Sequence, residues 1–185
     1  MSTRRSILAG GLSAAVVVTA LVPAAQAATA ADLTAQGRRA LAKLYASEPR
    51  SRLFERNARA ILVFPRILKA GLMVGAQTGD GVLLEHGKAA GFYNISAASF
   101  GLQAGGQAFS YALFFMSPGA LAYVHKSEGW SVGTGPSVVV VDKGGSAEAD
   151  SATLTHDVYA FPFAENGLMA GIDIKGSKIT PIHPK

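Results

Sequence analysis

The chain has 185 residues, of which 49% are hydrophobic, and a formal net charge of +5. This length fits a single domain with ample apolar material for a core. Because the chain has no cysteine, disulfides, thiolate metal sites, cysteine nucleophiles and a lipidated lipoprotein cysteine are excluded.

The first thirty residues have the pattern of an export signal. Arg4 and Arg5 precede an apolar run from Ile7 to Val22, and small residues follow at 25–30. This order is typical of a cleavable secretory signal, and the arginine pair also resembles a twin-arginine signal. The run, of roughly 16 residues, is short for a membrane span of roughly 20, so an uncleaved anchor is the weaker alternative. We expect cleavage of residues 1–30 and one exported domain, 31–185, in the periplasm, the cell envelope or the medium.

The basic residues are concentrated near the start of this domain. Residues 38–69 hold nine basic and two acidic side chains, whereas residues 70–185 hold six basic and nine acidic ones. Such an asymmetry favours an anionic partner, and phospholipid head groups are the first candidate. Nucleic acid is disfavoured because no RNP-type sequence, zinc-finger spacing or basic heptad region is present. An arginine-rich helix face that only contacts solvent is the alternative.

Two helices are predicted in this basic segment. Residues 32–46 place an apolar stripe at helical spacing, with Asp32 as N-cap and a stop at Pro49. Residues 52–59 predict a second helix capped by Ser51, with three arginines on one face. An apolar stripe beside an arginine face suits an interfacial helix, although a helix packed on a sheet has the same pattern.

The rest of the chain predicts strands. Pro65 ends the apolar run 61–64, and glycine-punctuated alternation indicates strands near 72–78, 82–86, 90–96, 101–108 and 111–115, with a hairpin turn at 78–81. A helix begins at Ser117-Pro118, and strands follow near 130–133, 137–142, 158–163, 168–174 and 178–182. The predicted class is α+β, with N-terminal helices and a curved, mostly antiparallel sheet or partly closed barrel. Trp130 is expected in the core, and residues 159, 161 and 163 on one face.

No pattern of catalytic or metal-binding residues is present in the sequence. The four histidines are His86, His125, His156 and His183, and no pair has helical zinc-site spacing. There is no G-x-S-x-G elbow and no P-loop. Acidic residues at 142, 148 and 150 could surround a cation, but solvated loop acids are the more frequent case. We therefore expect neither an enzyme nor a cofactor.

Three strings, in order and at matching spacing, resemble the SYLF domain. They lie at 61–83 (beginning Ile-Leu-Val-Phe-Pro), at 100–107 (Phe-Gly-Leu-Gln-Ala-Gly-Gly-Gln) and at 167–176 (Gly-Leu-Met-Ala-Gly-Ile-Asp-Ile-Lys-Gly). The resemblance covers roughly residues 53–182. It implies phospholipid binding through an amphipathic N-terminal helix and basic residues; eukaryotic members favour phosphoinositides and some bind actin. This chain departs from bacterial lipoprotein relatives, since it has no cysteine to lipidate, and actin binding makes little sense for an exported protein.

The sequence thus predicts an exported, non-catalytic module that binds anionic phospholipid at a membrane surface. The expected lipid-binding residues are Arg38, Arg39, Lys43, Arg52, Arg56, Arg59, Arg66 and Lys69. Leu41, Leu44 and Tyr45 of the first helix are expected to insert into the membrane. The alternative is a structural or interaction protein of the envelope, whose basic helices dock onto an acidic protein partner.

Overall fold

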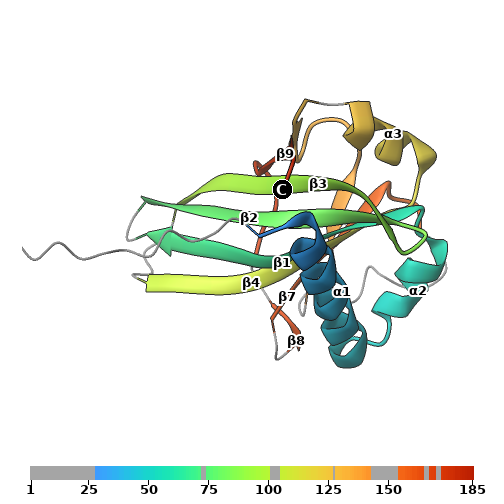
Figure 1. The fold of residues 1–185 in the computed structure, drawn as a ribbon, viewed down its shortest axis with the longest axis horizontal. Coiled ribbons are helices and arrows are strands. Elements are labelled where there is room, and N and C mark those ends of the chain that lie inside the picture. Colours follow the sequence, from blue (N-terminus) through green and yellow to red (C-terminus); the bar gives the residue numbers. More distant parts are fainter. Residues whose placement is uncertain are drawn as a thin grey trace, which may run out of the picture.

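The computed structural model describes residues 28–71, 74–100, 105–126, 128–142, 154–164, 167–169 and 172–185. Its helices are α1 (Ala30–Ser47), α2 (Ser51–Asn57) and α3 (Pro118–Lys126). Its strands are β1 (Ala60–Gly71), β2 (Val74–Glu85), β3 (Lys88–Phe100), β4 (Gly105–Phe115), β5 (Trp130–Ser131), β6 (Val138–Val140), β7 (Val158–Ala164), β8 (Gly167–Leu168) and β9 (Lys178–Ile182). The predicted α+β class, with N-terminal helices before a sheet, is confirmed (Figure 1).

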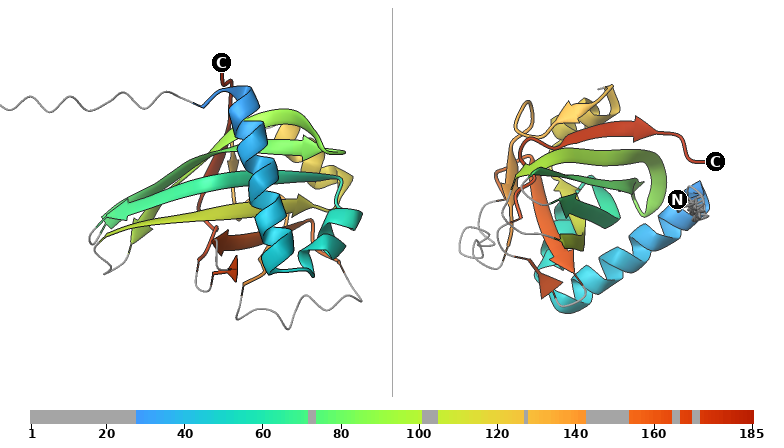
Figure 2. Two further views of the ribbon diagram at one scale, coloured as in Figure 1. Left: turned by 60° about the horizontal axis from the view of Figure 1, so that its bottom comes forward. Right: turned by 90° about the vertical axis from the view of Figure 1, so that its left-hand side faces the viewer.

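The described strands form one curled sheet. Their order is β5-β9-β3-β2-β1-β4-β7-β6, and β8 pairs with β7. All neighbours are antiparallel except β6 and β7, which run parallel. Viewed along the long strands, the sheet curls into a half-barrel with α1 outside it (Figure 2). The predicted curved, mostly antiparallel sheet is therefore confirmed.

The sheet has two apolar faces, which we call inner and outer. The inner face encloses one core cluster, which includes Leu62, Phe64 and Tyr111. The outer face carries a second cluster, in which Val63 and Val82 meet residues of α1 and α2. Because neighbouring strand residues point to opposite faces, the apolar run of β1 serves both clusters.

Helix α1 lies across the outer face of the sheet (Figures 1 and 2). Its buried stripe is the predicted one: Leu33, Gly37, Ala40, Leu41, Leu44 and Tyr45. The predicted N-cap, Asp32, is wrong. The cap is Thr29, whose Oγ1 accepts a hydrogen bond from the backbone N–H of Asp32 at 3.1 Å. The Asp32 side chain contributes in another way: its Oδ2 accepts a hydrogen bond from the Thr29 hydroxyl, with 2.8 Å between the two oxygens. The N-cap of the second helix is also wrong, because Ser51 is the first residue of α2 and Arg50 the cap position.

The predicted hairpin turn at 78–81 is wrong, because these residues lie in the middle of the continuous strand β2. Their glycines make room for neighbours rather than for a turn. A Cβ on Gly81 would lie 2.5 Å from the ring of Phe64, and one on Gly79 would lie 2.5 Å from the Arg66 carbonyl oxygen. The turn instead uses His86 and Gly87, with positive φ angles of 50° and 76°. Glycine and a left-handed residue favour the two-residue turn that joins β2 to β3.

The first strand runs through Pro65, which in the sequence only marked the end of an apolar run. β1 continues to Gly71, and its pairing with β2 and with β4 shifts register on either side of the proline. Proline has no backbone N–H to donate, so within sheets it is found at edges and bulges. The irregularity at Pro65 and Arg66 therefore interrupts the ladder locally and lets the strand resume.

Other predicted elements agree with the structure to varying degrees. Trp130 is buried, and its Nε1 donates to the carbonyl oxygen of Thr134 at 2.9 Å. The α3 start is confirmed, since Ser117 Oγ accepts from the N–H of Ala120. Tyr159, Phe161 and Phe163 all lie in the outer cluster, as predicted. The strand expected at 168–174 is wrong in extent, because β8 ends at residue 168.

The expected export signal and the acidic residues 148 and 150 lie outside the described residues, apart from 28–30. Among the helices that are described, none combines the length and apolar character needed to span a bilayer.

Candidate anion-binding groove

Helix α1 presents one polar flank beside its buried stripe. Gln36, Arg39 and Lys43 are spaced three and four residues apart, so they share this flank. Arg38 belongs to the other flank, where its guanidinium donates to the carbonyl oxygen of Gly87 at 2.8 Å. The two neighbouring arginines, which the sequence places together, therefore face different surroundings.

The strand side of the groove comes from the irregularity in β1. Pro65 and Arg66 lie there, and the Ser110 hydroxyl of β4 donates to the Pro65 carbonyl oxygen at 2.8 Å. Phe109 and Phe163 add apolar surface at the base and are themselves almost fully buried. The proline thus supplies a fixed carbonyl acceptor at the point where the ladder is interrupted.

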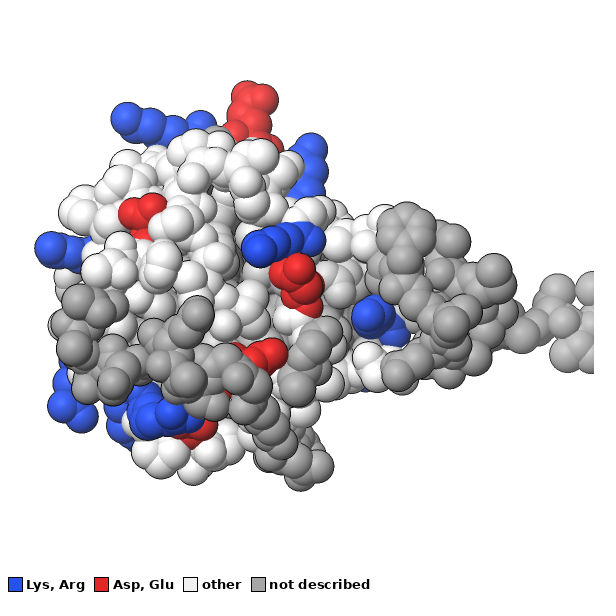
Figure 3. All heavy atoms as spheres, turned by 180° about the vertical axis from the view of Figure 1, so that it is seen from behind, with Lys and Arg blue, Asp and Glu red and all other residues white. Residues whose placement is uncertain are grey.

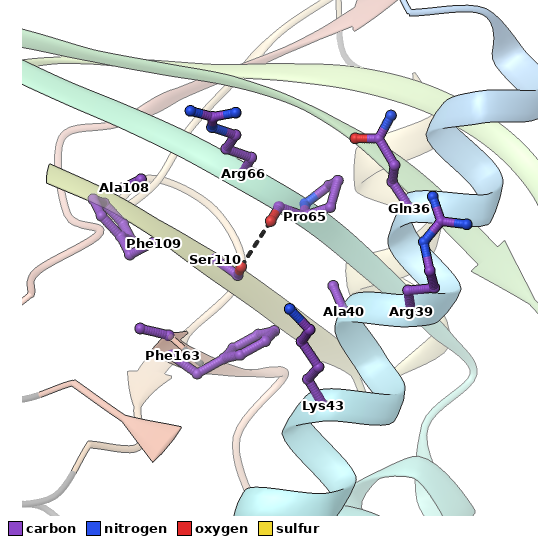
Figure 4. A pocket seen from close by; sticks show the side chains of 11 residues that line it. Gln36, Arg39, Ala40, Lys43, Pro65, Arg66, Ala108, Phe109, Ser110 and Phe163 are labelled. Atoms are coloured by element: carbon purple, nitrogen blue, oxygen red, sulfur yellow. Dashed lines mark hydrogen bonds between the residues drawn. The ribbon is translucent and has the colours of Figure 1, made fainter. Parts of the chain in front are cut away.

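Together these residues line a hollow of about 500 Å³ between α1 and strands β1, β4 and β7 (Figure 4). We call it the cationic groove and define it by its three cations, Arg39, Lys43 and Arg66. Its full lining is Gln36, Arg39, Ala40, Lys43, Pro65, Arg66, Ala108, Phe109, Ser110, Phe163 and Ala164. Among the lining residues that the structure describes, three are cationic and none is acidic.

The groove cations are open to solvent. Arg39, Lys43 and Arg66 are all exposed, and within the described part of the chain neither Arg39 nor Arg66 belongs to an ion pair. In Figure 4 the Lys43 amine points from α1 toward β4, while Arg66 projects from β1, the strand that pairs with β4. Cations on two walls above an apolar base suit a ligand with an anionic head and an apolar body.

The other predicted cations do not join this groove. Arg52 lies over the Tyr45 ring, 4.8 Å from its centroid, and 4.0 Å from the Glu55 carboxylate. Arg56 in α2 and Arg59 just after it are exposed, and both precede the start of β1 at Ala60. Lys69 is half-buried on β1, three residues after the groove arginine. The structure therefore divides the predicted patch among several surfaces.

Leu41, Leu44 and Tyr45, which were predicted to insert into a membrane, are buried against the sheet in this structure. Their exposed fractions are 6%, 0% and 8%, and all three pack in the outer cluster. Burial, followed by the nearby Glu55 carboxylate, also raises the pKa of the Tyr45 hydroxyl. The apolar stripe predicted to insert into a membrane is the side of α1 that packs on the sheet. A helix that covers an apolar sheet face needs the same spacing of apolar residues as a helix that lies on a membrane.

The face opposite α1 differs from the groove side. In Figure 3, lysines and arginines alternate with acidic side chains and are separated by broad uncharged areas. Charges of both signs at such spacing give no concentrated field of one sign. The groove, by contrast, places three cations around an apolar hollow.

The sequence did not reveal Gln36, Ser110 or the two phenylalanines as groove residues. Gln36 could have been found from its helical spacing to Arg39 and Lys43. The strand residues could not, because only the fold brings β4 and β7 beside α1.

No cluster of metal-ligating side chains occurs among the described residues. The His125–Glu85 contact, 2.7 Å between Nε2 and Oε1, is a surface pair between α3 and β2.

Comparison with known proteins gives one family match. Residues 96–183, from β3 to just past β9, match the family described as "Ysc84: Las17-binding protein actin regulator". The middle and closing strings noted in the sequence lie inside this range, whereas the opening string at 61–83 precedes it. A search of curated proteins gave no match. The match to residues 96–183 agrees with the resemblance seen in the sequence and is consistent with a member of the SYLF domain family, which is of lipid- or actin-binding type.

Proposed function

We propose that this protein is an exported phospholipid-binding module that recognises anionic head groups through the cationic groove. The observation that carries the proposal is the arrangement of Arg39, Lys43 and Arg66 around an apolar hollow with no acidic lining residue among those described. A lipid phosphate would be held by the two guanidinium groups and the ammonium group, because charge-assisted hydrogen bonds to phosphate are strong.

The proposal assigns a binding role without catalysis. Ser110 is the only hydroxyl residue among the described groove residues, and its proton is donated to the Pro65 carbonyl oxygen. A nucleophilic serine needs a base that accepts its proton. The family description names actin regulation. We do not extend it to this chain, since the export that we propose would separate the protein from actin.

The test is sedimentation of the processed protein with vesicles of phosphatidylglycerol and phosphatidylcholine. Binding should require the anionic lipid and weaken in high salt, because surface attraction is screened beyond about 8 Å at physiological ionic strength. Each cation near an anionic surface contributes about 1 kcal/mol. The triple variant Arg39→Ala/Lys43→Ala/Arg66→Ala should therefore bind roughly a hundredfold more weakly.

A matched control removes the same charge elsewhere. Arg52→Ala/Arg56→Ala/Arg59→Ala also removes three cations, but from around α2 rather than from the groove. We expect it to change affinity by less than roughly threefold. Equal loss in both variants would show that net charge, not the groove, controls binding. Unchanged binding in the groove variant would reject the proposed site.

The alternative function is docking onto an acidic protein partner. The same exposed cations would favour it, since charge complementarity also guides protein association. The vesicle test separates the two functions: a protein that ignores anionic vesicles but recovers a defined acidic partner through Arg39, Lys43 and Arg66 would support docking.

A further inference from the structure

The four long strands extend past α1, and no helix that the structure describes covers the outer face of their far ends (Figure 1). We call this part the distal face and define it by Leu68, Ala70, Ala76, Ala98 and Ala108. Cross-strand pairing places them together: Leu68 pairs with Ala108, Ala70 with Ala76, and Ala76 with Ala98. All five are exposed, and Leu68 is 48% exposed, although leucine is usually buried.

The distal half of these strands carries almost no charge. The sequence has no Asp, Glu, Lys or Arg at 70–79 or at 89–124. Lys69, on the inner side of the same region, is the exception. Soluble sheets ordinarily protect such surfaces with charged side chains or proline. An exposed, uncharged sheet face of this kind indicates contact with something other than bulk water.

The edges of the same region are also unpaired within the described structure. β9 pairs with β3 as far as Ser96, and β7 pairs with β4 as far as Ser110. Beyond these points, residues 97–100 of β3 and 105–109 of β4 form edges without charged side chains. Their backbone groups need water or polar head groups, because hydrocarbon satisfies no hydrogen bond.

The distal face and the cationic groove form one continuous surface. Ala108 belongs to both, and Leu68 follows the groove's Arg66 by two residues along β1. An apolar face bordered by cations complements a partner that is anionic at its surface and apolar beneath it. A second copy of the chain fits less well, because a two-fold contact through this face would bring two sets of the same cations together.

We propose that the distal face lies against an anionic bilayer at the depth of the head groups, while the adjoining groove holds a lipid phosphate. This inference rests on the proposed function and adds the orientation of the bound protein. The head-group layer is about 7 Å thick, so a sheet face that lies in it meets head groups rather than the hydrocarbon core. The alanines add little apolar area, so the face rests in that layer and the edge backbone stays hydrated.

The absence of cysteine allows a direct test with single labelled positions. Ala76→Cys and Ala98→Cys place an environment-sensitive fluorophore (NBD) on the distal face. Ala122→Cys is the matched control: it is the same substitution at an exposed position on α3, far from the distal strand ends (Figure 1). The processed, labelled proteins are mixed with vesicles of phosphatidylglycerol and phosphatidylcholine.

With vesicles, emission from positions 76 and 98 should rise and shift to the blue, and head-group nitroxide lipids should quench it. Emission from position 122 should not change. Sedimentation with no response at 76 and 98 would overturn the orientation while leaving the proposed function intact. Absence of sedimentation would reject both. A response that depends on protein concentration without vesicles would show that a second copy covers the face, which also overturns the inference.

A charge variant provides an independent readout without a label. Ala98→Glu places an anion on the distal face and should weaken vesicle binding threefold to tenfold, because it faces a surface of the same sign. Ala122→Glu changes the net charge equally on α3 and should have little effect. Thermal unfolding of both variants checks that the fold is kept. Equal binding by the two variants would contradict the assigned orientation.

Discussion

A methyl group added to Gly37 would lie 2.5 Å from Cγ1 of Val82, so α1 approaches β2 more closely than any side chain at residue 37 would allow. Val82 is fully buried and β-branched, which leaves it little freedom to move. This contact fixes the height of α1 above the sheet. The same helix carries Arg39 and Lys43, so the Gly37–Val82 contact also sets the width of the cationic groove.

The first prediction concerns this contact. Gly37→Val should lower the free energy of unfolding by about 1–3 kcal/mol, since overpacking a closed interface forces the helix or the strand to shift. Ala42→Val is the control on the exposed side of α1 and should cost less than about 0.7 kcal/mol through helix propensity alone. Urea denaturation measures both. Equal costs would mean that α1 packs more loosely than the structure shows.

Local signals in the sequence predicted much of the fold. The periodicity of residues 33–45 gave α1 and its buried stripe, and Ser117 marked the start of α3. Local signals failed where a distant neighbour determines the role of a residue. Gly79 and Gly81 were interpreted as part of a turn. Glycine is needed there because Arg66 and Phe64 of β1 lie too close to leave room for a Cβ atom.

The candidate site was only partly predictable for the same reason. Arg39, Lys43 and Arg66 were among the basic residues expected to bind lipid, but nothing local separates them from Arg52 or Arg38. The distinction depends on which flank of α1 faces the irregularity at Pro65. The buried stripe of α1 was ambiguous in another way, because a helix on a sheet and a helix on a membrane need the same apolar spacing.

The second prediction concerns the anchoring of α2. Phe54 is 2% exposed and meets three aromatic rings, with centroids 4.9 Å away for Tyr159 and Phe161 and 6.1 Å away for Phe114. Phe54→Ala should cost about 3–5 kcal/mol, because it removes a large buried ring from a packed cluster. Leu53→Ala, at the half-buried neighbour, should cost clearly less. Chemical denaturation with both variants tests this ranking, and the reverse order would contradict the packing.

The third prediction concerns the start of α1 and the processing site. Thr29 caps the helix, and the N–H of Ala30 donates to the Lys185 carbonyl oxygen at 3.1 Å. Cleavage after Ala27 keeps these contacts, whereas cleavage after Ala30 removes them. Loss of a threonine N-cap costs about 1 kcal/mol, so a chain that begins at Ala28 should be more stable than one that begins at Ala31.

Mass measurement of the processed protein identifies its first residue. Thermal unfolding then compares the chain from Ala28 with the Thr29→Ala variant, which should be less stable by about 1 kcal/mol. Asp32→Asn is a useful comparison, because the backbone N–H of residue 32 can still donate to Thr29 Oγ1. A mature terminus at Ala31 with undiminished stability would disprove the role of this cap.

The last prediction concerns pH and the carboxylate of Asp157, which joins the starts of α3 and β6. It accepts hydrogen bonds from the Ser117 hydroxyl at 2.7 Å and from the N–H and hydroxyl of Ser137, both at 3.0 Å. These hydrogen bonds, that from Ser117 first, hold the pKa of Asp157 below its usual value. A lowered pKa in the folded state means that the charged carboxylate stabilises the fold above the unfolded-state pKa. This contribution is lost as the pH falls through the folded-state pKa.

Asp157→Asn should therefore be less stable than the wild type at pH 6, and the difference should shrink as the pH falls below about 4. Urea denaturation midpoints across this range measure the effect. Ser137→Ala keeps the carboxylate but removes one of its donors, so its stability should depend less steeply on pH than that of the wild type. A stability difference for Asp157→Asn that stays constant between pH 6 and pH 3 would show that the carboxylate acts through shape rather than through its charge.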